Sequence, residues 1–298
     1  MPNVKLKNYL HLHFIIFIWG FTAVLGKLIT IDALPLVWYR MLIAVVLIAL
    51  FILFRKYGLS VSSKNIGILV LAGIIIALHW VTFFRAIKVS NVSIALATMS
   101  TGALFTALLE PLWYGRKMIW YEVVFGLIVA LGLYIIFNVD AAYVEGITLA
   151  LISALLASIF SLINGKLIQK ERPSVISFYE LGSGVLFLSF YLAIQGGFDP
   201  GFFVLSPNDW VFIFILASVC TAYAFIASVK VMKYITPYTV MLSINLEPVY
   251  GIILAFLILG DSERMKPEFY VGAAIILGTV VLNGMLKTVL KLKKEGRG

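Results

Sequence analysis

The sequence predicts an all-α polytopic membrane protein of ten transmembrane helices, built as two inverted five-helix repeats. Composition is the first reason, because 62% of the residues are hydrophobic and only 12% are charged. Soluble domains are about half apolar and about a quarter charged. The second reason is a regular series of apolar windows, and the third is an internal repetition of sequence. No polar stretch is long enough to form a separate soluble domain.

Ten apolar windows follow one another along the chain. Most are close to the roughly 20 residues that a helix needs to cross about 30 Å of hydrocarbon. The links between them are mostly short, so neighbouring helices are expected to be antiparallel. Lys5 and Lys7 precede the first window without a small-residue cleavage site, so this window is expected to stay as a helix. The expected spans are residues 9–29, 35–54, 65–86, 92–114, 118–138, 145–168, 174–195, 208–230, 238–260 and 267–287.

Basic residues gather at alternate ends of these windows. This bias predicts a multi-pass protein of the plasma (inner) membrane with both termini cytoplasmic. Arg85, Lys88, Arg264 and Lys266 are exceptions on the expected outer side. The net charge of +9 is attributed to topology and lipid attraction, not to nucleic-acid binding. The expected inner ends carry Lys5, Lys7, Arg55, Lys56, Lys64, Arg116, Lys117, Lys170, Arg172, Lys230, Lys233 and the basic residues of the tail.

The chain repeats itself at an offset of 146 positions. The segment from Gly126 to Gly132 matches the segment from Gly272 to Gly278 at this offset. We therefore expect two repeats, residues 1–140 and residues 141–298 with a basic cytoplasmic tail. Each holds five spans, an odd number, so the second should lie upside down relative to the first. Inverted repeats are typical of secondary transporters, whose sites lie near the membrane midplane between the repeats. Glycine-rich helices could also be packing devices.

Glu247 is the only charged side chain between Tyr238 and Gly260, and it falls near the middle of that window. An ionised carboxylate is costly inside a bilayer, so it should face protein or a wet cavity. Pro248 removes a helical hydrogen bond and is expected to break the helix, which would free Asn245 and Glu247 for polar contacts. These residues are candidates for substrate binding or coupling. The alternative is a kinked helix whose carboxylate is tied to a neighbouring helix.

Three further ionisable residues fall inside expected spans. Arg40 either extends outward to the interface or meets an anionic group of a substrate. His79 is a candidate for proton coupling because its charge changes near neutral pH, although a hydrogen-bonded packing role is the common case. Glu180 could pair with a basic residue at the same depth. All three are expected to face the gap between the repeats, because polar groups avoid lipid.

Aromatic residues complete the set of candidates. Trp19, Trp38 and Tyr39 could line a cavity suited to apolar or aromatic solutes. Core packing or an interfacial belt is the usual role of any single aromatic residue.

Several segments resemble the EamA family of the drug/metabolite transporter superfamily. They are Trp19-Gly20, the stretch from Arg85 to Ser93, and the Glu247-Pro248 segment that ends in Gly260-Asp261-Ser262-Glu263. The resemblance covers nearly the whole chain. It implies export or exchange of small metabolites, often amino acids or related compounds, without ATP. The first repeat departs from this pattern, because Thr101-Gly102 stands at the position of Glu247-Pro248.

Other classes of protein fit the sequence less well. No metal-ligand set, nucleophile with a base, or phosphate-binding loop is visible, so neither an enzyme, a metal site nor a cofactor is expected. A channel or a receptor-like protein remains an alternative, and an intramembrane enzyme is a less favoured one. The expected partners are a small-molecule substrate, membrane lipid and, if Glu247 or His79 couples transport, protons.

Overall fold

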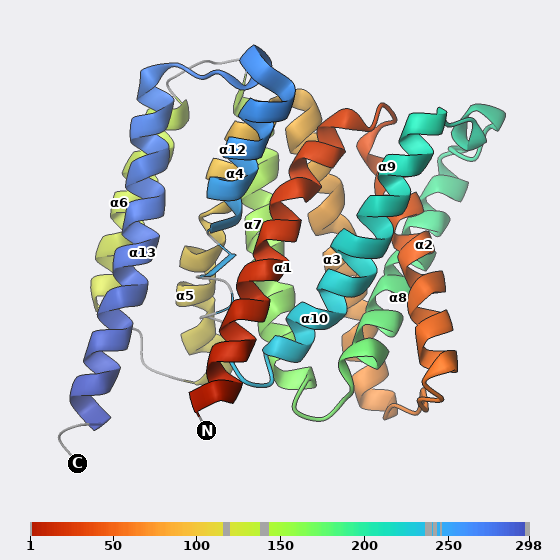
Figure 1. Ribbon diagram of the computed structural model, residues 1–298, viewed down its shortest axis with the longest axis horizontal. Coiled ribbons are helices and arrows are strands. Elements are labelled where there is room, and N and C mark those ends of the chain that lie inside the picture. The colour runs from red at the N-terminus through yellow and green to blue at the C-terminus, as the bar shows by residue number, and fades with distance from the viewer. Residues whose placement is uncertain are drawn as a thin grey trace.

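The computed structural model describes residues 2–115, 120–137, 143–235, 240, 243–244 and 246–295. The elements in this part of the chain are all helical (Figure 1). Their order is α1 (Pro2–Leu28), α2 (Ala33–Phe54), α3 (Ser63–Val89), α4 (Val92–Met99), α5 (Gly102–Tyr114), α6 (Trp120–Phe137), α7 (Val144–Leu167), α8 (Pro173–Ile194), η2 (Pro200–Phe203), α9 (Pro207–Ala217), η3 (Ser218–Tyr223), α10 (Ala224–Val231), α12 (Leu246–Leu259), η4 (Gly260–Glu263) and α13 (Pro267–Glu295).

Seven helical segments of the described chain are long and apolar enough to cross a membrane. Each overlaps one of the expected spans, which makes the protein an integral, multi-pass membrane protein. Shorter apolar segments, Val124–Ile136 and Pro267–Asn283, fall in the windows expected at 118–138 and 267–287. The window at 238–260 lies partly outside the described residues and continues from Leu246 as α12. The seven long segments are Leu6–Leu28, Ala33–Phe54, Ser63–Val89, Val92–Tyr114, Val144–Leu167, Pro173–Ile194 and Pro207–Val231.

Two of these segments are not continuous α-helices. The span expected at 92–114 is interrupted at Ser100 and Thr101, which separate α4 from α5. Both hydroxyl groups bond back to carbonyls of α4, from Ser100 to Leu96 (3.3 Å) and from Thr101 to Thr98 (2.8 Å). Such bonds compete with the regular helical pattern. The span expected at 208–230 contains a π-helical turn, η3, between α9 and α10.

Pro248 is the third residue of α12 as described, and Asn245, directly before that helix, lies outside the described residues, so the helix break expected at Pro248 stays a prediction. At the offset of 146 positions, Ser100 and Thr101 between α4 and α5 correspond to Leu246 and Glu247 in α12.

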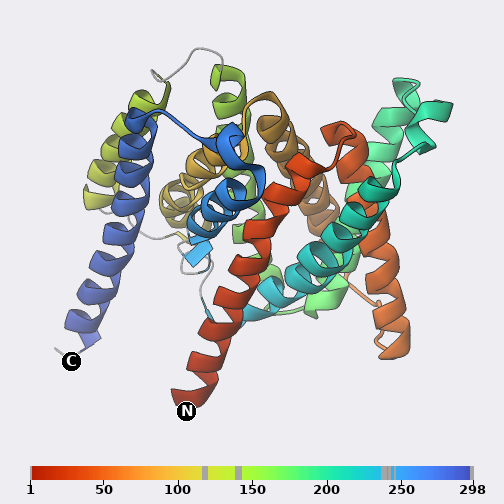
Figure 2. The same cartoon turned by 45° about the horizontal axis from the view of Figure 1, so that its top comes forward.

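Helices α6 and α13 form a pair at one edge of the molecule, apart from the main bundle (Figures 1 and 2). They meet where Gly132 faces Gly272. A Cβ atom on Gly272 would lie 2.8 Å from the carbonyl oxygen of Gly132, and one on Gly132 would lie 3.0 Å from the carbonyl oxygen of Gly272. The repeated glycine motifs thus pack against each other, as small residues do between membrane helices.

Basic residues that break the expected charge bias have specific partners at the same end of the bundle. Arg85 forms an exposed salt bridge with Glu145 at 3.0 Å. The ammonium group of Lys88 donates to the carbonyl oxygen of Ile29 at 2.9 Å, just beyond the C-terminus of α1. A cation stabilises the negative end of a helix, so Lys88 fits a local structural role.

Candidate functional site

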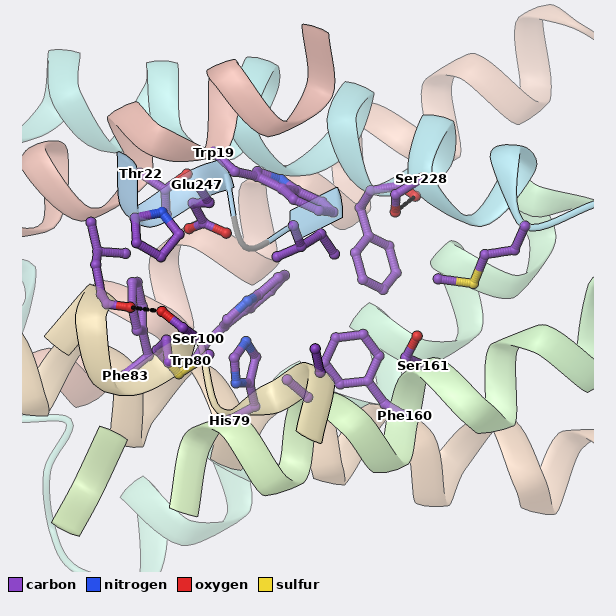
Figure 3. A pocket seen from close by; sticks show the side chains of 18 of the residues that line it. Trp19, Thr22, His79, Trp80, Phe83, Ser100, Phe160, Ser161, Ser228 and Glu247 are labelled. Atoms are coloured by element: carbon purple, nitrogen blue, oxygen red, sulfur yellow. Dashed lines mark hydrogen bonds between the residues drawn. The ribbon is translucent and has the colours of Figure 1, made fainter. Parts of the chain in front are cut away.

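A cavity of about 100 Å³ lies in the middle of the main bundle. Its walls are largely aromatic and aliphatic, with a few polar groups between them, as in most small-molecule sites. Figure 3 shows Glu247, Trp19 and Thr22 along one side, with His79, Trp80 and Phe83 facing them. The lining residues are Trp19, Thr22, Arg40, His79, Trp80, Phe83, Leu96, Met99, Ser100, Ala103, Ala157, Phe160, Ser161, Phe225, Ser228, Met232, Ile244, Glu247 and Pro248.

Arg40 is the only arginine or lysine in this lining, and its side chain is 2% exposed. Nε donates to Oγ1 of Thr221 at 2.6 Å, and the guanidinium lies 3.9 Å from the centre of the Trp80 ring. The side chain therefore does not extend outward to the interface. Its Nη1 atom has no hydrogen-bond partner among the described residues. The cation is fixed by two contacts and still keeps a free donor.

The π-helical turn η3 supplies the groups that hold Arg40. Thr221 accepts from Arg40 while its own hydroxyl donates to the carbonyl of Leu216 at 2.7 Å. One residue earlier, the carbonyl of Cys220 accepts a hydrogen bond from Nε1 of Trp19 at 3.1 Å. A π turn frees backbone groups from the helical pattern and is frequent at functional sites. Here it connects α1 and α2 to the wall of the cavity.

Glu247 lines the same cavity from the first turn of α12. Within the part of the chain that the structure describes, it forms no salt bridge, because the pair Arg85–Glu145 is the only one there. Its helix packs closely on α1, since a Cβ atom on Gly20 would lie 2.9 Å from the Cβ atom of Tyr250. The Trp19-Gly20 pair and the Glu247-Pro248 segment, which carry the family resemblance, therefore meet beside the cavity.

His79 joins the cavity wall to α7. Its Nδ1 atom lies 2.9 Å from the carbonyl oxygen of Ser153 and 2.8 Å from the Ser153 hydroxyl, which itself donates to the carbonyl of His79. A carbonyl oxygen can only accept, so these contacts favour a proton on Nδ1. Nε2 is then the acceptor nitrogen of the neutral ring.

The other expected site residues lie elsewhere. Trp38 donates to Oγ of Ser189 at 2.8 Å, and Tyr39 donates to the carbonyl of Phe202 at 3.2 Å. Both pack in an aromatic cluster with η2 and not in the lining of the cavity. Glu180 is completely buried outside the lining, and its partner is Asn164 instead of a basic residue. Asn245 lies outside the described residues.

Two residues that bind the N-terminus of α4, Asn91 before that helix and Glu263 at the end of η4, have roles that the sequence did not predict. The carboxylate of Glu263 accepts from the backbone N–H groups of Val92 (3.1 Å) and Ser93 (2.9 Å) and from the Ser93 hydroxyl (2.9 Å). Oδ1 of Asn91 accepts from the N–H of Ile94 at 2.8 Å. Asn before a helix is a recognisable capping signal. The contact of Glu263 joins two distant segments and has no local signal.

No group of three or more His, Cys, Asp or Glu side chains that could hold a metal ion is found among the described residues. The side chains of the cavity lining include one guanidinium, one imidazole, one carboxyl and several hydroxyls. This arrangement can bind an organic solute that carries both charged and apolar parts.

The helices define a multi-pass membrane protein, and a cavity lies within its bundle. The model of the EamA-like transporter family matches residues 8–138 and again residues 144–285. The chain therefore belongs to the EamA-like transporter family, and it is a membrane transporter with a small-molecule substrate.

Similar proteins agree with this assignment. An uncharacterized transporter of Archaeoglobus fulgidus is 24% identical over 297 residues, covering 96% of this chain and 98% of the relative. An uncharacterized transporter of Clostridium kluyveri is 25% identical over 248 residues, and the alignment covers 79% of this chain and 78% of the relative. One crystal structure superposes with a TM-score of 0.69 at 17% identity, covering 95% of this chain and 98% of that chain, which shows a shared fold.

Proposed function

We propose that the protein is a secondary transporter of the plasma membrane that exports or exchanges small metabolites by alternating access. The observation that carries the proposal is the place of the cavity. It lies between helices of the first expected repeat (α1 to α5) and helices of the second (α7, α10 and α12). A site between two inverted five-helix halves can be exposed to either side as the halves rock around it.

The lining supports a substrate with an anionic group and an apolar part, such as an amino acid or a related compound. Arg40 offers a fixed cation with a free Nη1 donor, the arrangement that binds a carboxylate well. Trp19, Trp80 and Phe160 offer apolar surface around it. A bound carboxylate would accept a hydrogen bond from Nη1 of Arg40, which has no partner among the described residues.

Glu247 supports a coupling role in the same proposal. It shares the cavity with Arg40, so a substrate carboxylate and the Glu247 carboxylate would compete for one positive charge. A proton on Glu247 would remove that competition. Binding of the substrate anion and of a proton would then favour each other, and the pair would bias which side opens.

The test is a thermal-stability screen of the purified protein with a panel of metabolites. Each carboxylic acid is paired with its own amide or decarboxylated analogue. At least one acid should raise the melting temperature, and its analogue should not. Arg40→Gln should weaken binding of that acid at least about tenfold, because hydrogen bonds to a charged group contribute about 1.5–3 kcal/mol.

Arg55→Gln is the matched control, since Arg55 follows the same helix α2 and is exposed. Equal stabilisation by acids and their analogues, or unchanged binding in Arg40→Gln, would contradict the assignment of Arg40.

A further inference from the structure

A second polar cluster lies outside the cavity, between α7 and α8. Glu180 and Asn164 are both 0% exposed. Nδ2 of Asn164 donates to Oε2 of Glu180 at 3.4 Å. Oε1 of Glu180 and Oδ1 of Asn164 have no hydrogen-bond partner among the described residues. The two unpartnered oxygens thus belong to the same two side chains.

The charged and titratable groups on the helices around Glu180 have other partners or are exposed. Arg40 on α2 is bound to Thr221, and His79 on α3 is bound to Ser153. Lys166 on α7 is exposed and donates to the carbonyl of Trp113. The hydroxyl of Tyr179 donates to the carbonyl of Leu59. Further basic residues nearby are exposed: Lys64 and Arg85 on α3, Lys170 after α7, Arg172 before α8 and Lys230 on α10.

An ionised Glu180 would therefore be a buried carboxylate without a counter-charge, which is among the costliest arrangements inside a protein. A proton on Oε1 removes this cost in two ways. It neutralises the group, and it turns Oε1 into a donor for the unpartnered Oδ1 of Asn164. The acid and the amide would then form a reciprocal pair, each donating once and accepting once.

Along α7, Asn164 lies between the cavity-lining Ser161 and the end of the helix at Leu167. Ser161 lines the cavity and is three residues before Asn164, so both occupy one face of α7. Oγ of Ser161 also lacks a partner among the described residues. Glu180 is seven residues into α8, or roughly 10 Å from its start, and Arg172 precedes that start.

We propose that Glu180 and Asn164 form a second proton-binding site, separate from Glu247, which exchanges its proton with the cavity through Ser161. A sodium ion fits the pair less well, because the amide Nδ2 donates to Oε2 and places positive charge where a cation would bind. The protonation of Glu180 follows from its surroundings alone. The exchange of this proton during a transport cycle rests on the proposed function.

Infrared spectroscopy of the purified full-length protein in lipid tests the site with the proton itself as the probe. At neutral pH, the wild type should show the carbonyl stretch of a buried, protonated carboxylic acid that shifts in heavy water. Glu180→Gln should lose this band, whereas Glu247→Gln and the exposed control Glu268→Gln should keep it. Ser161→Ala should keep the band and slow its shift in heavy water.

A difference spectrum between wild type and Glu180→Gln that shows no loss of a protonated-acid band, both in the natural background and in a Glu247→Gln background, would overturn the proposal. So would stabilisation of the wild type, but not of Glu180→Gln, by sodium ions at constant ionic strength. Exchange in heavy water that is unaffected by Ser161→Ala would refute the route through the cavity. If Glu180→Gln does not fold, Asn164→Leu provides the second test, because the wild-type band must then move to the position of an acid without an amide partner. None of these readouts needs a transport substrate, so they stand or fall separately from the proposed function.

Discussion

At the scale of single residues, the cavity brings together ionisable groups that are far apart in the sequence. Arg40, His79 and Glu247 come from α2, α3 and α12, and no salt bridge joins them among the described residues. Arg40 is fixed by Thr221, and His79 by Ser153. Prepositioned polar groups bind a ligand with less ordering cost than mobile ones.

Replacement of Glu247 by Gln should abolish the pH dependence of flux. The amide keeps the size and hydrogen-bonding capacity of the protonated acid but cannot release a proton. Flux against pH in vesicles should therefore be flat in Glu247→Gln, while exchange of bound substrate survives. Glu268→Gln, at an exposed glutamate, should behave as the wild type. A pH profile that is the same in Glu247→Gln and wild type, at equal expression, would leave Glu247 as a structural tie only.

The intramembrane charges could be located from the sequence because they are rare and must face protein or water. That argument placed Arg40, His79 and Glu247 away from lipid, but it could not assign a partner to any of them. The aromatic residues were less informative. Trp19 lines the cavity, while Trp38 and Tyr39 pack against η2, and nothing in the local sequence separates the two cases.

At the scale of elements, the site depends on helices that are interrupted. The apolar windows predicted the spans, because hydrophobic length is a strong signal. They did not predict the π turn η3, since Ser218 to Tyr223 contains neither proline nor glycine, nor the interruption between α4 and α5. Both depend on tertiary contacts, which include the bond from Arg40 to Thr221 and the bond from Ser158 to the carbonyl of Gly102 at 2.7 Å.

The N-terminus of α4 should be sensitive to loss of the carboxylate of Glu263. Glu263→Ala removes the acceptor of two backbone N–H groups and one hydroxyl, and it should destabilise the protein by about 1–3 kcal/mol. Asp261→Ala, in the same turn and exposed, is the matched control and should have little effect. Thermal unfolding in detergent measures both variants, and equal melting temperatures would show that the cap contributes nothing measurable.

At the scale of the whole molecule, the cavity is lined by helices of both segments that match the family, residues 8–138 and 144–285. Helices α6 and α13 form a separate pair at the edge of the bundle (Figures 1 and 2). The sequence repetition predicts that the two matching segments are inverted. The positive-inside bias predicts the orientation, and Arg85 and Lys88, which depart from that bias, contact Glu145 and the carbonyl of Ile29.

Reporter fusions test this topology directly. A fusion after Asp140 should report the outer side, because five expected spans separate it from the cytoplasmic N-terminus. A fusion after Lys294 should report the cytoplasm, because five more expected spans lie between the two fusion points. Reports from the same side would contradict the inverted arrangement.

The central claim is that the cavity around Arg40 carries a solute across the membrane by alternating access. Counterflow in proteoliposomes measures this most directly, with the acid identified by the stability screen loaded inside and its labelled form added outside at low concentration. The wild type and Arg55→Gln should accumulate label transiently above its equilibrium level, and Arg40→Gln should lose most of this accumulation. Label that only equilibrates, at a rate that does not saturate, would indicate a channel, and full counterflow in Arg40→Gln would place the transport site elsewhere.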